Sequence, residues 1–172
     1  MKSHLLLTGA QGAGKSTAMR RLAELLGAAP GGFYTEEMRA AGERRGFRLV
    51  AFNGWEAVIA HVEFPKTQRV GKYGVDLAAI DEASENTLVP SPGVDIYVVD
   101  EIGKMECLSE RFVARMRALL DSKLTVVATV ASRGGGFIAE AKRREDCELW
   151  SLTRGNRDAI PGRILRWIRD KK

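Results

Sequence analysis

The chain has 172 residues, of which 45% are hydrophobic and 28% charged, and its formal net charge is +5. This size and composition are typical of one globular domain with a full core, so we expect residues 1–172 to form a single domain. No stretch approaches the ~20 apolar residues of a membrane span, and the apolar run 4–8 is too short for a signal peptide. We therefore expect a cytoplasmic protein without membrane association.

The basic charge, with a pI of about 9.4, suits an anionic partner such as a nucleotide. The densest basic stretches are residues 39–48, 142–144 and 163–172, and aromatic residues do not alternate with them as they do in RNA-binding sites. Nucleic acid is thus a permitted but not a favoured partner. Two cysteines, Cys107 and Cys147, lack metal-site spacing and are expected to be reduced thiols. With only two histidines, a zinc site or His-based catalysis is not expected.

A glycine-rich segment at residues 9–16 matches the phosphate-binding pattern G-x-x-x-x-G-K-[ST]. A predicted buried strand at residues 4–8 precedes it, and a predicted helix at residues 17–26 follows. In this context the glycine backbone and the helix N-terminus turn N–H groups toward a phosphate chain. Lys15 is then predicted to reach the β- and γ-phosphates, and Ser16 to ligate Mg²⁺. The predicted nucleotide-binding residues here are Gly9, Ala10, Gln11, Gly12, Ala13, Gly14, Lys15, Ser16 and Thr17.

The remaining pattern alternates strands and helices. Further strands are predicted at residues 32–39, 46–52, 55–62, 94–99, 124–130 and 147–152. Further helices are predicted at residues 75–86 (capped by Asp76), 109–120, 137–144 and 156–169. The pair 32–39 and 46–52 reads as a hairpin, and residues 63–74 as an exposed loop. Continuous apolar strands between helices predict an α/β fold with a mainly parallel sheet covered on both faces.

The apolar strand at residues 94–99 is followed by Asp100 and Glu101. Ligands of such sheets bind at the carboxyl ends of the strands, where the glycine-rich loop also lies. Asp100 is the expected Walker B carboxylate for Mg²⁺, and Glu101 is predicted to orient and deprotonate an attacking water. The carboxylate directly after Asp100 favours hydrolysis over phosphoryl transfer to an acceptor. We therefore predict Lys15 and Glu101 as catalytic residues, and Ser16 and Asp100 as metal ligands.

Three further segments resemble the THEP1-type nucleoside-triphosphatases, called cancer-related nucleoside-triphosphatase in vertebrates. They are Asp-Glu-Ile-Gly-Lys-Met-Glu at 100–106, Gly-Phe-Tyr-Thr-Glu-Glu at 32–37, and Val-Gly-Lys-Tyr-Gly-Val-Asp-Leu at 70–77. The resemblance implies slow hydrolysis of nucleoside triphosphates to the diphosphate and phosphate, with broad base choice. With the predicted Mg²⁺ ligands, we therefore expect Mg²⁺-dependent hydrolysis of ATP, GTP, CTP and UTP or TTP. It also implies a three-layer, RecA-like P-loop NTPase fold, to which the hairpin is an addition. In that fold another strand lies between the phosphate-loop strand and the Walker B strand.

Several roles stay open. Lys104, Arg69 and Lys72 are candidates to stabilise charge on the transferring phosphate. Otherwise Lys104 caps or covers the start of the following helix, and Arg69 and Lys72 are solvated loop residues. Glu36 and Glu37 could border the site or only the hairpin surface. Thr129 is either a γ-phosphate sensor or a buried strand threonine. After the last strand, Asn156 and Arg157 are candidates to contact the base, although Asn156 could instead cap the final helix.

Two other functions remain as alternatives. A nucleoside, nucleotide or polynucleotide kinase would need an arginine-rich lid, for which Arg133, Arg143 and Arg144 are candidates. A nucleotide-dependent switch linked to RNA would show slow turnover that RNA stimulates and binding that weakens with salt. No heptad or long apolar patch indicates an obligate oligomer, so a monomer is expected.

Overall fold

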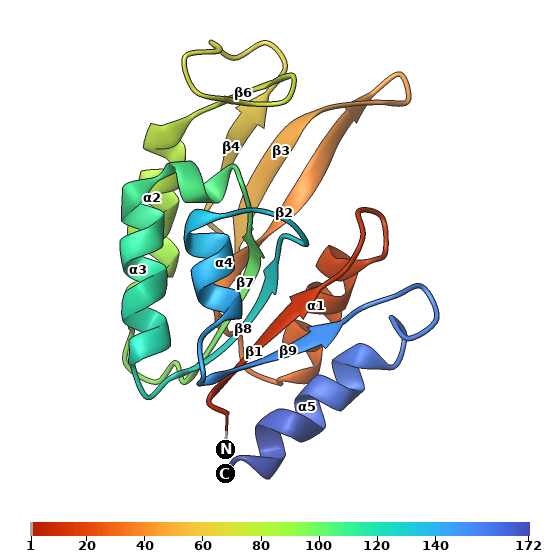
Figure 1. Cartoon of the computed structure of the whole chain (residues 1–172), viewed down its shortest axis with the longest axis vertical. Helices are drawn as coiled ribbons and strands as arrows, with labels where there is room; N and C mark the ends of the chain where they lie inside the picture. Colours follow the sequence, from red (N-terminus) through yellow and green to blue (C-terminus); the bar gives the residue numbers. More distant parts are fainter. Residues whose placement is uncertain (1) are drawn as a thin grey trace.

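Apolar side chains on both sides of the central strands require the sheet to be covered on both faces. In the computed structural model, which describes residues 2–172, nine strands form one sheet with helices on either side (Figure 1). The strands are β1 His4–Thr8, β2 Gly31–Ala40, β3 Glu43–Ala51, β4 Glu56–His61, β5 Arg69–Val70, β6 Tyr73–Val75, β7 Ile96–Ile102, β8 Thr125–Val130 and β9 Cys147–Ser151. The helices are α1 Lys15–Leu25, α2 Leu77–Thr87, α3 Glu110–Asp121, α4 Gly136–Lys142 and α5 Ile160–Asp170, with a 3-10 turn η1 at Glu106–Leu108.

The strand order is β5-β6-β4-β3-β2-β7-β8-β1-β9. The five strands from β2 to β9 in this order run parallel, whereas β3, β4, β6 and β5 extend the sheet in antiparallel fashion. Strand β8 lies between β1 and β7, which confirms the RecA-like order that the family resemblance implied. The antiparallel extension contains the predicted hairpin, β2 and β3.

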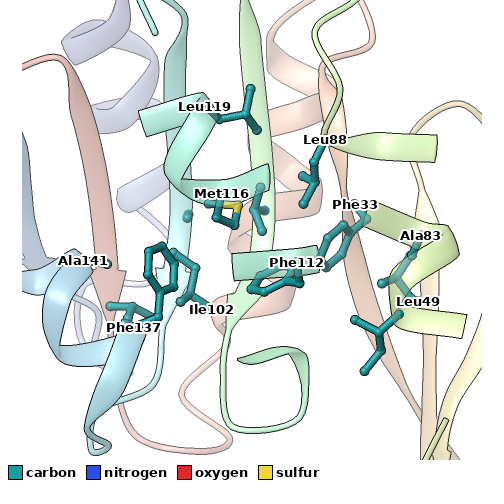
Figure 2. Close-up of a cluster of buried hydrophobic side chains, with 14 of the residues drawn as sticks. Phe33, Leu49, Ala83, Leu88, Ile102, Phe112, Met116, Leu119, Phe137 and Ala141 are labelled. Atoms are coloured by element: carbon teal, nitrogen blue, oxygen red, sulfur yellow. The ribbon is translucent and has the colours of Figure 1, made fainter. Parts of the chain in front are cut away.

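Alternate side chains of each central strand enter opposite layers. In β1, Leu6 belongs to the core cluster that contains side chains of α2, α3 and α4, whereas Leu5 and Leu7 belong to the cluster that contains side chains of α1 and α5. Figure 2 shows the first of these clusters, in which Phe112 of α3 lies beside Phe33 of β2 with ring centroids 6.3 Å apart. Because β1, β8 and β7 are parallel neighbours, their carboxyl ends lie at one edge of the sheet, where the predicted site residues lie.

Some predicted boundaries are wrong. Residues 63–74, predicted as an exposed loop, contain β5 and β6, because the Tyr73 ring is buried edge-on against Phe47 with centroids 5.2 Å apart. The final helix begins at Ile160 instead of residue 156, with Pro161 in its first turn. The residues before it form turns in which Asn156 Oδ1 accepts from the Thr153 amide at 2.7 Å. Asn156 is therefore not the cap of that helix, whose cap residue is Ala159.

The other differences concern where elements end. The hairpin strands are longer than predicted, and a tight turn at Ala41 and Gly42, both with positive φ, joins them. Helix α1 begins at Lys15, inside the motif, and β7 continues through Asp100 and Glu101. The predicted cap of α2 is confirmed, because Asp76 accepts from the Ala79 amide at 3.1 Å.

Candidate active site

The glycine-rich loop connects the carboxyl end of β1 to the first turn of α1. Gly12 and Gly14 have φ of 79° and 105°, which side-chain-bearing residues rarely adopt. Gly9 is required for a different reason, since a Cβ there would lie 2.6 Å from the Leu152 carbonyl oxygen. These glycines therefore give the loop its curvature, and α1 starts directly after it with its N–H groups facing the loop.

Lys15 and Glu101 face each other at the carboxyl ends of the strands. Lys15 Nζ donates to the Gly9 carbonyl oxygen at 2.7 Å and lies 3.7 Å from Glu101 Oε2. Burial raises the pKa of Glu101, the positive charge of Lys15 lowers it, and the charge of Asp100 raises it further. The predicted phosphate-binding cation and the predicted base thus share one site, with the base at a raised pKa.

Asp100 is the centre of a small hydrogen-bond network. Its side chain accepts from Ser16 Oγ at 2.5 Å and from Thr129 Oγ1 at 2.7 Å. The Thr35 amide adds a long contact of 3.4 Å. Asp100 is 2% exposed and Thr129 is fully buried. The network brings the two predicted metal ligands, Ser16 and Asp100, into direct contact, with Thr129 holding Asp100 from β8.

A second carboxyl group, that of Glu106, lies beside Glu101. The sequence alone had predicted no role for it. A Cβ on Gly103 would lie 2.7 Å from Glu101 Oε1 and 2.8 Å from Glu106 Oε1, so both side chains converge over that glycine. Burial, followed by the charge of Glu101, raises the pKa of Glu106 to about 8. Glu106 is therefore protonated near neutral pH. The only signal in the sequence is its place in the family-like segment 100–106.

The raised pKa of Glu106 leads us to expect that the free energy of unfolding depends on pH. In the unfolded chain this carboxyl ionises near its ordinary pKa of 4.5, whereas in the folded chain it stays protonated up to about pH 8. Its contribution to the free energy of unfolding is therefore lost as pH rises through this window. We expect Glu106→Gln to be more stable than the wild type at pH 8, by up to about 5 kcal/mol, and by little at pH 4.5.

Denaturant unfolding of the nucleotide-free protein at several pH values measures this difference. Glu145→Gln, a change at an exposed carboxylate, is the control and should show no such trend. A difference between Glu106→Gln and wild type that stays constant or shrinks with rising pH would contradict the assignment.

The site opens into a cleft of about 790 Å³. Among the candidates with open roles, Lys104, Glu36 and Glu37 line this cleft, as does Arg133. Within the described residues, neither Arg69 nor Lys72 lines it; Lys72 lies over the Tyr73 ring at 5.5 Å. Of the two other predicted lid arginines, Arg144 is held by Asp121 and Asp146 at 2.9 and 2.8 Å. The cleft also includes Arg44 of β3, which the sequence analysis had noted only as part of the basic stretch at residues 39–48.

A smaller pocket of about 290 Å³ lies beside the end of the loop and the first turns of α1. It is lined by Gly14, Thr17, Ala18, Arg21, Arg157 and Asp158. Arg157 packs over Gly14, because a Cβ there would lie 3.2 Å from its Cδ. Asn156 instead stabilises the turn, donating to the Ser151 carbonyl oxygen at 2.9 Å. The structure therefore brings Arg157, but not the Asn156 side chain, to a pocket beside the loop.

Two features are absent from the residues that the structure describes. Within residues 2–172, no three His, Cys, Asp or Glu side chains gather closely enough to hold a metal by themselves. No helix in the same range has both the length and the apolar character needed to cross a bilayer.

Comparison with known proteins identifies the family. The family model described as NTPase matches residues 4–165. The chain belongs to the THEP1-type nucleoside-triphosphatase family. A relative named nucleoside-triphosphatase THEP1 from Thermotoga sp. (strain RQ2) is 39% identical and covers 94% of this chain and 92% of its own. The human cancer-related nucleoside-triphosphatase is 32% identical over the whole of both chains.

A solved structure supports the same membership. The crystal structure of THEP1 from the hyperthermophile Aquifex aeolicus superposes with a TM-score of 0.87 at 32% identity, covering 95% of this chain and 98% of the other. The family resemblance found in the sequence is thus confirmed, and so are the P-loop NTPase fold and the enzyme class, a nucleoside-triphosphatase.

Proposed function

We propose that this NTPase hydrolyses ATP, GTP, CTP and UTP or TTP slowly, with Mg²⁺, to the nucleoside diphosphate and phosphate. The observation that carries the proposal is the joint position of Lys15, Glu101 and the Ser16–Asp100 pair at the carboxyl ends of β1 and β7. In P-loop enzymes the glycine-rich loop binds the phosphates at this edge of the sheet, and a carboxylate at the end of a neighbouring strand lies close to the bound phosphates.

Phosphate binding is assigned to the loop and the first turn of α1. The amides of residues 9–17 surround the phosphate chain, and Lys15 exchanges its bond to Gly9 for the β- and γ-phosphate oxygens. Lys15 is suited to this exchange, since its present partners are a carbonyl oxygen and a carboxylate 3.7 Å away.

The Ser16 hydroxyl and the Asp100 carboxylate would hold Mg²⁺ together with the substrate phosphates. Mg²⁺ prefers oxygen ligands and is commonly bound by one or two carboxylates plus phosphates, which fits a site with this pair in contact at 2.5 Å. When bound, the ion neutralises charge on the phosphates. Thr129 fixes the second Asp100 oxygen and thereby leaves Oδ2 as the oxygen facing Ser16.

Glu101 is assigned as the general base. Its carboxylate takes a proton from water as the water oxygen bonds to the γ-phosphorus and the bond from that phosphorus to the bridging oxygen breaks. The bridging oxygen leaves on the nucleoside diphosphate. Burial raises the pKa of Glu101, which makes it a better proton acceptor than an exposed carboxylate. The neighbouring protonated Glu106 adds no negative charge beside it at neutral pH.

Base contact is assigned to the pocket beside Gly14, with Arg157 as the side chain available to lie against a base. A single guanidinium face can stack on any base, which supports broad base choice. Asn156 then acts by shaping the turn that carries Arg157. We also propose that the protein acts as a monomer in the cytoplasm, where its net charge of +5 suits an anionic substrate.

The test is phosphate release from ATP, GTP, CTP and UTP with Mg²⁺ and without any acceptor. We expect release from all four, with kcat values within about tenfold of one another, because one stacking contact discriminates by about 1.4 kcal/mol or less. Omission of Mg²⁺ should abolish release. Nucleotide binding without release would reject the proposal, and the same assay with added nucleosides or RNA would then test the kinase and switch alternatives.

A further inference from the structure

The hairpin of β2 and β3 delivers an arginine to the phosphate loop. Arg44 lies one residue beyond the start of β3 and lines the same cleft as Lys15 and Glu101. With the Gln11 amide oriented so that its oxygen faces the guanidinium, Arg44 Nη2 donates to that oxygen at 2.8 Å. Gln11 is the third residue of the phosphate loop, so the guanidinium lies directly over the segment assigned to the phosphates.

Three further side chains hold Arg44 in this position. Its Nε donates to the Tyr73 hydroxyl at 3.0 Å, and its Nη1 donates to Glu37 Oε1 at 3.1 Å. Its guanidinium carbon lies 5.5 Å from the centroid of the Phe47 ring. Because Phe47 and Tyr73 pack edge to face, the arginine stands on a fixed aromatic support. Such a side chain is pre-organised and loses little rotamer entropy when it binds an anion.

Among the other cations around the cleft, Arg20 also lies over an aromatic ring, 5.4 Å from the Tyr34 centroid, but in the described part of the chain none is held by as many side chains as Arg44. Apart from Lys15, the cleft is lined by the cations Arg20, Arg44, Lys104 and Arg133. Arg20, Lys104 and Arg133 are exposed, and within residues 2–172 neither Lys104 nor Arg133 has a side-chain hydrogen bond or ion pair. The Arg44 side chain is 27% exposed and is bonded to three residues.

We propose that Arg44 is a catalytic residue of the hydrolysis reaction, supplied by the chain itself, that binds the γ-phosphate oxygens as negative charge develops on them. This inference rests on the proposed function. Arg44 transfers no proton and forms no covalent bond; its guanidinium exchanges Gln11 for phosphate oxygens and keeps Tyr73 as its support. A planar fork of N–H donors is matched to phosphate oxygens, and arginines in this role contribute to kcat more than to substrate binding.

The experiment compares Arg44→Ala with Arg39→Ala. Arg39 is the cross-strand neighbour of Arg44, bonds to the same Glu37 at 3.1 Å, and does not line the cleft. We expect Arg44→Ala to lower kcat about 10²-fold with KM changed less than about threefold, and Arg39→Ala to keep both. We expect this fall in kcat to be smaller than the largest effects of such arginines, because the Arg44 side chain stays partly exposed to solvent.

Two readouts and one further variant separate a catalytic role from a structural one. Affinity for ADP with aluminium fluoride, which mimics the transferring phosphate, should fall about 10²-fold in Arg44→Ala, while affinity for ADP alone stays within about threefold. Millimolar guanidinium should restore part of the lost kcat in Arg44→Ala and should not affect Arg39→Ala. Arg44→Lys, which keeps the charge and the stem but not the fork, should recover less than about a tenth of the wild-type kcat.

The outcomes are distinguishable. If the wild type releases no phosphate, the proposed function fails before Arg44 is tested. If the wild type hydrolyses NTPs and Arg44→Ala keeps its kcat, the inference is wrong. An equal loss of affinity for ADP and for ADP with aluminium fluoride also overturns it, because that pattern reports binding or folding. Should Arg44→Ala fail to fold, the same measurements on Arg44→Lys and Arg44→Gln decide by the same criteria.

Discussion

Replacing Glu101 by Gln should lower kcat about 10³-fold and leave nucleotide affinity nearly unchanged, because the amide cannot accept the proton of the attacking water. The change keeps the shape of the side chain and removes only its charge and basicity. Lys15 loses a carboxylate 3.7 Å away, so binding of anionic nucleotide should tighten slightly if it changes at all. Single-turnover phosphate release and a fluorescent nucleotide titration measure the two effects separately.

The pH dependence of kcat provides a second test of the role of Glu101. Glu101 must be ionised to act as a base, and burial raises its pKa above the ordinary 4.5. Wild-type kcat should therefore fall as pH drops through this raised pKa, and the acidic limb should be absent from the residual activity of Glu101→Gln. Glu24→Gln, the same change at an exposed position of α1, is the control. Full turnover by Glu101→Gln would show that another group, or water alone, accepts the proton.

Lys15→Ala should lower both binding and turnover, with kcat/KM about 10³-fold below the wild type. Lys15 is assigned to the oxygens of two phosphates, and each charge-assisted hydrogen bond contributes about 1.5–3 kcal/mol. Unlike Glu101→Gln, this variant should raise the dissociation constant for nucleotide as well as lower kcat. The two variants thus separate ground-state binding from the chemical step.

Titration calorimetry with ADP and with a non-hydrolysable ATP analogue measures the binding part of the Lys15 effect. Lys123→Ala is the control, since Lys123 is exposed and precedes β8 at the opposite end of the sheet. Retained affinity for the ATP analogue in Lys15→Ala would contradict the assignment of this lysine to the β- and γ-phosphates.

Short-range constraints made the first half of the site predictable from the sequence. The phosphate-binding loop needs glycines with positive φ, a lysine and a serine directly after them, and a strand directly before them. All of these features are close together in the sequence, so their spacing alone predicts the loop. Asp100 and Glu101 could be placed for a similar reason, because the carboxyl ends of parallel strands meet at one edge. Residues that were assigned to the same edge do lie together.

Longer-range relations were only partly predictable. The hairpin was predicted from alternation and turn residues, but its length was underestimated, since Ala41 takes a positive φ that its residue type does not signal. The short strands β5 and β6 were missed because polar neighbours conceal the burial of Tyr73. The start of α5 was misplaced because the Asn156 side chain bonds back to Thr153 rather than capping that helix.

The sequence by itself determined the family, the fold class, and the loop and carboxylates at the strand ends, because these depend on local spacing and on strand polarity. Only the tertiary structure decided that Arg44 lies over Gln11, that Glu106 shares Gly103 with Glu101, and that Thr129 holds Asp100. The contacts of Arg44 with Gln11 and of Thr129 with Asp100 join segments that are distant in the chain and whose registers are fixed by packing of the whole sheet. Glu101 and Glu106 are close in sequence, and the turn that follows β7 brings them together over Gly103. No local pattern encodes such a register, so the side chains that complete the cleft become visible only after folding.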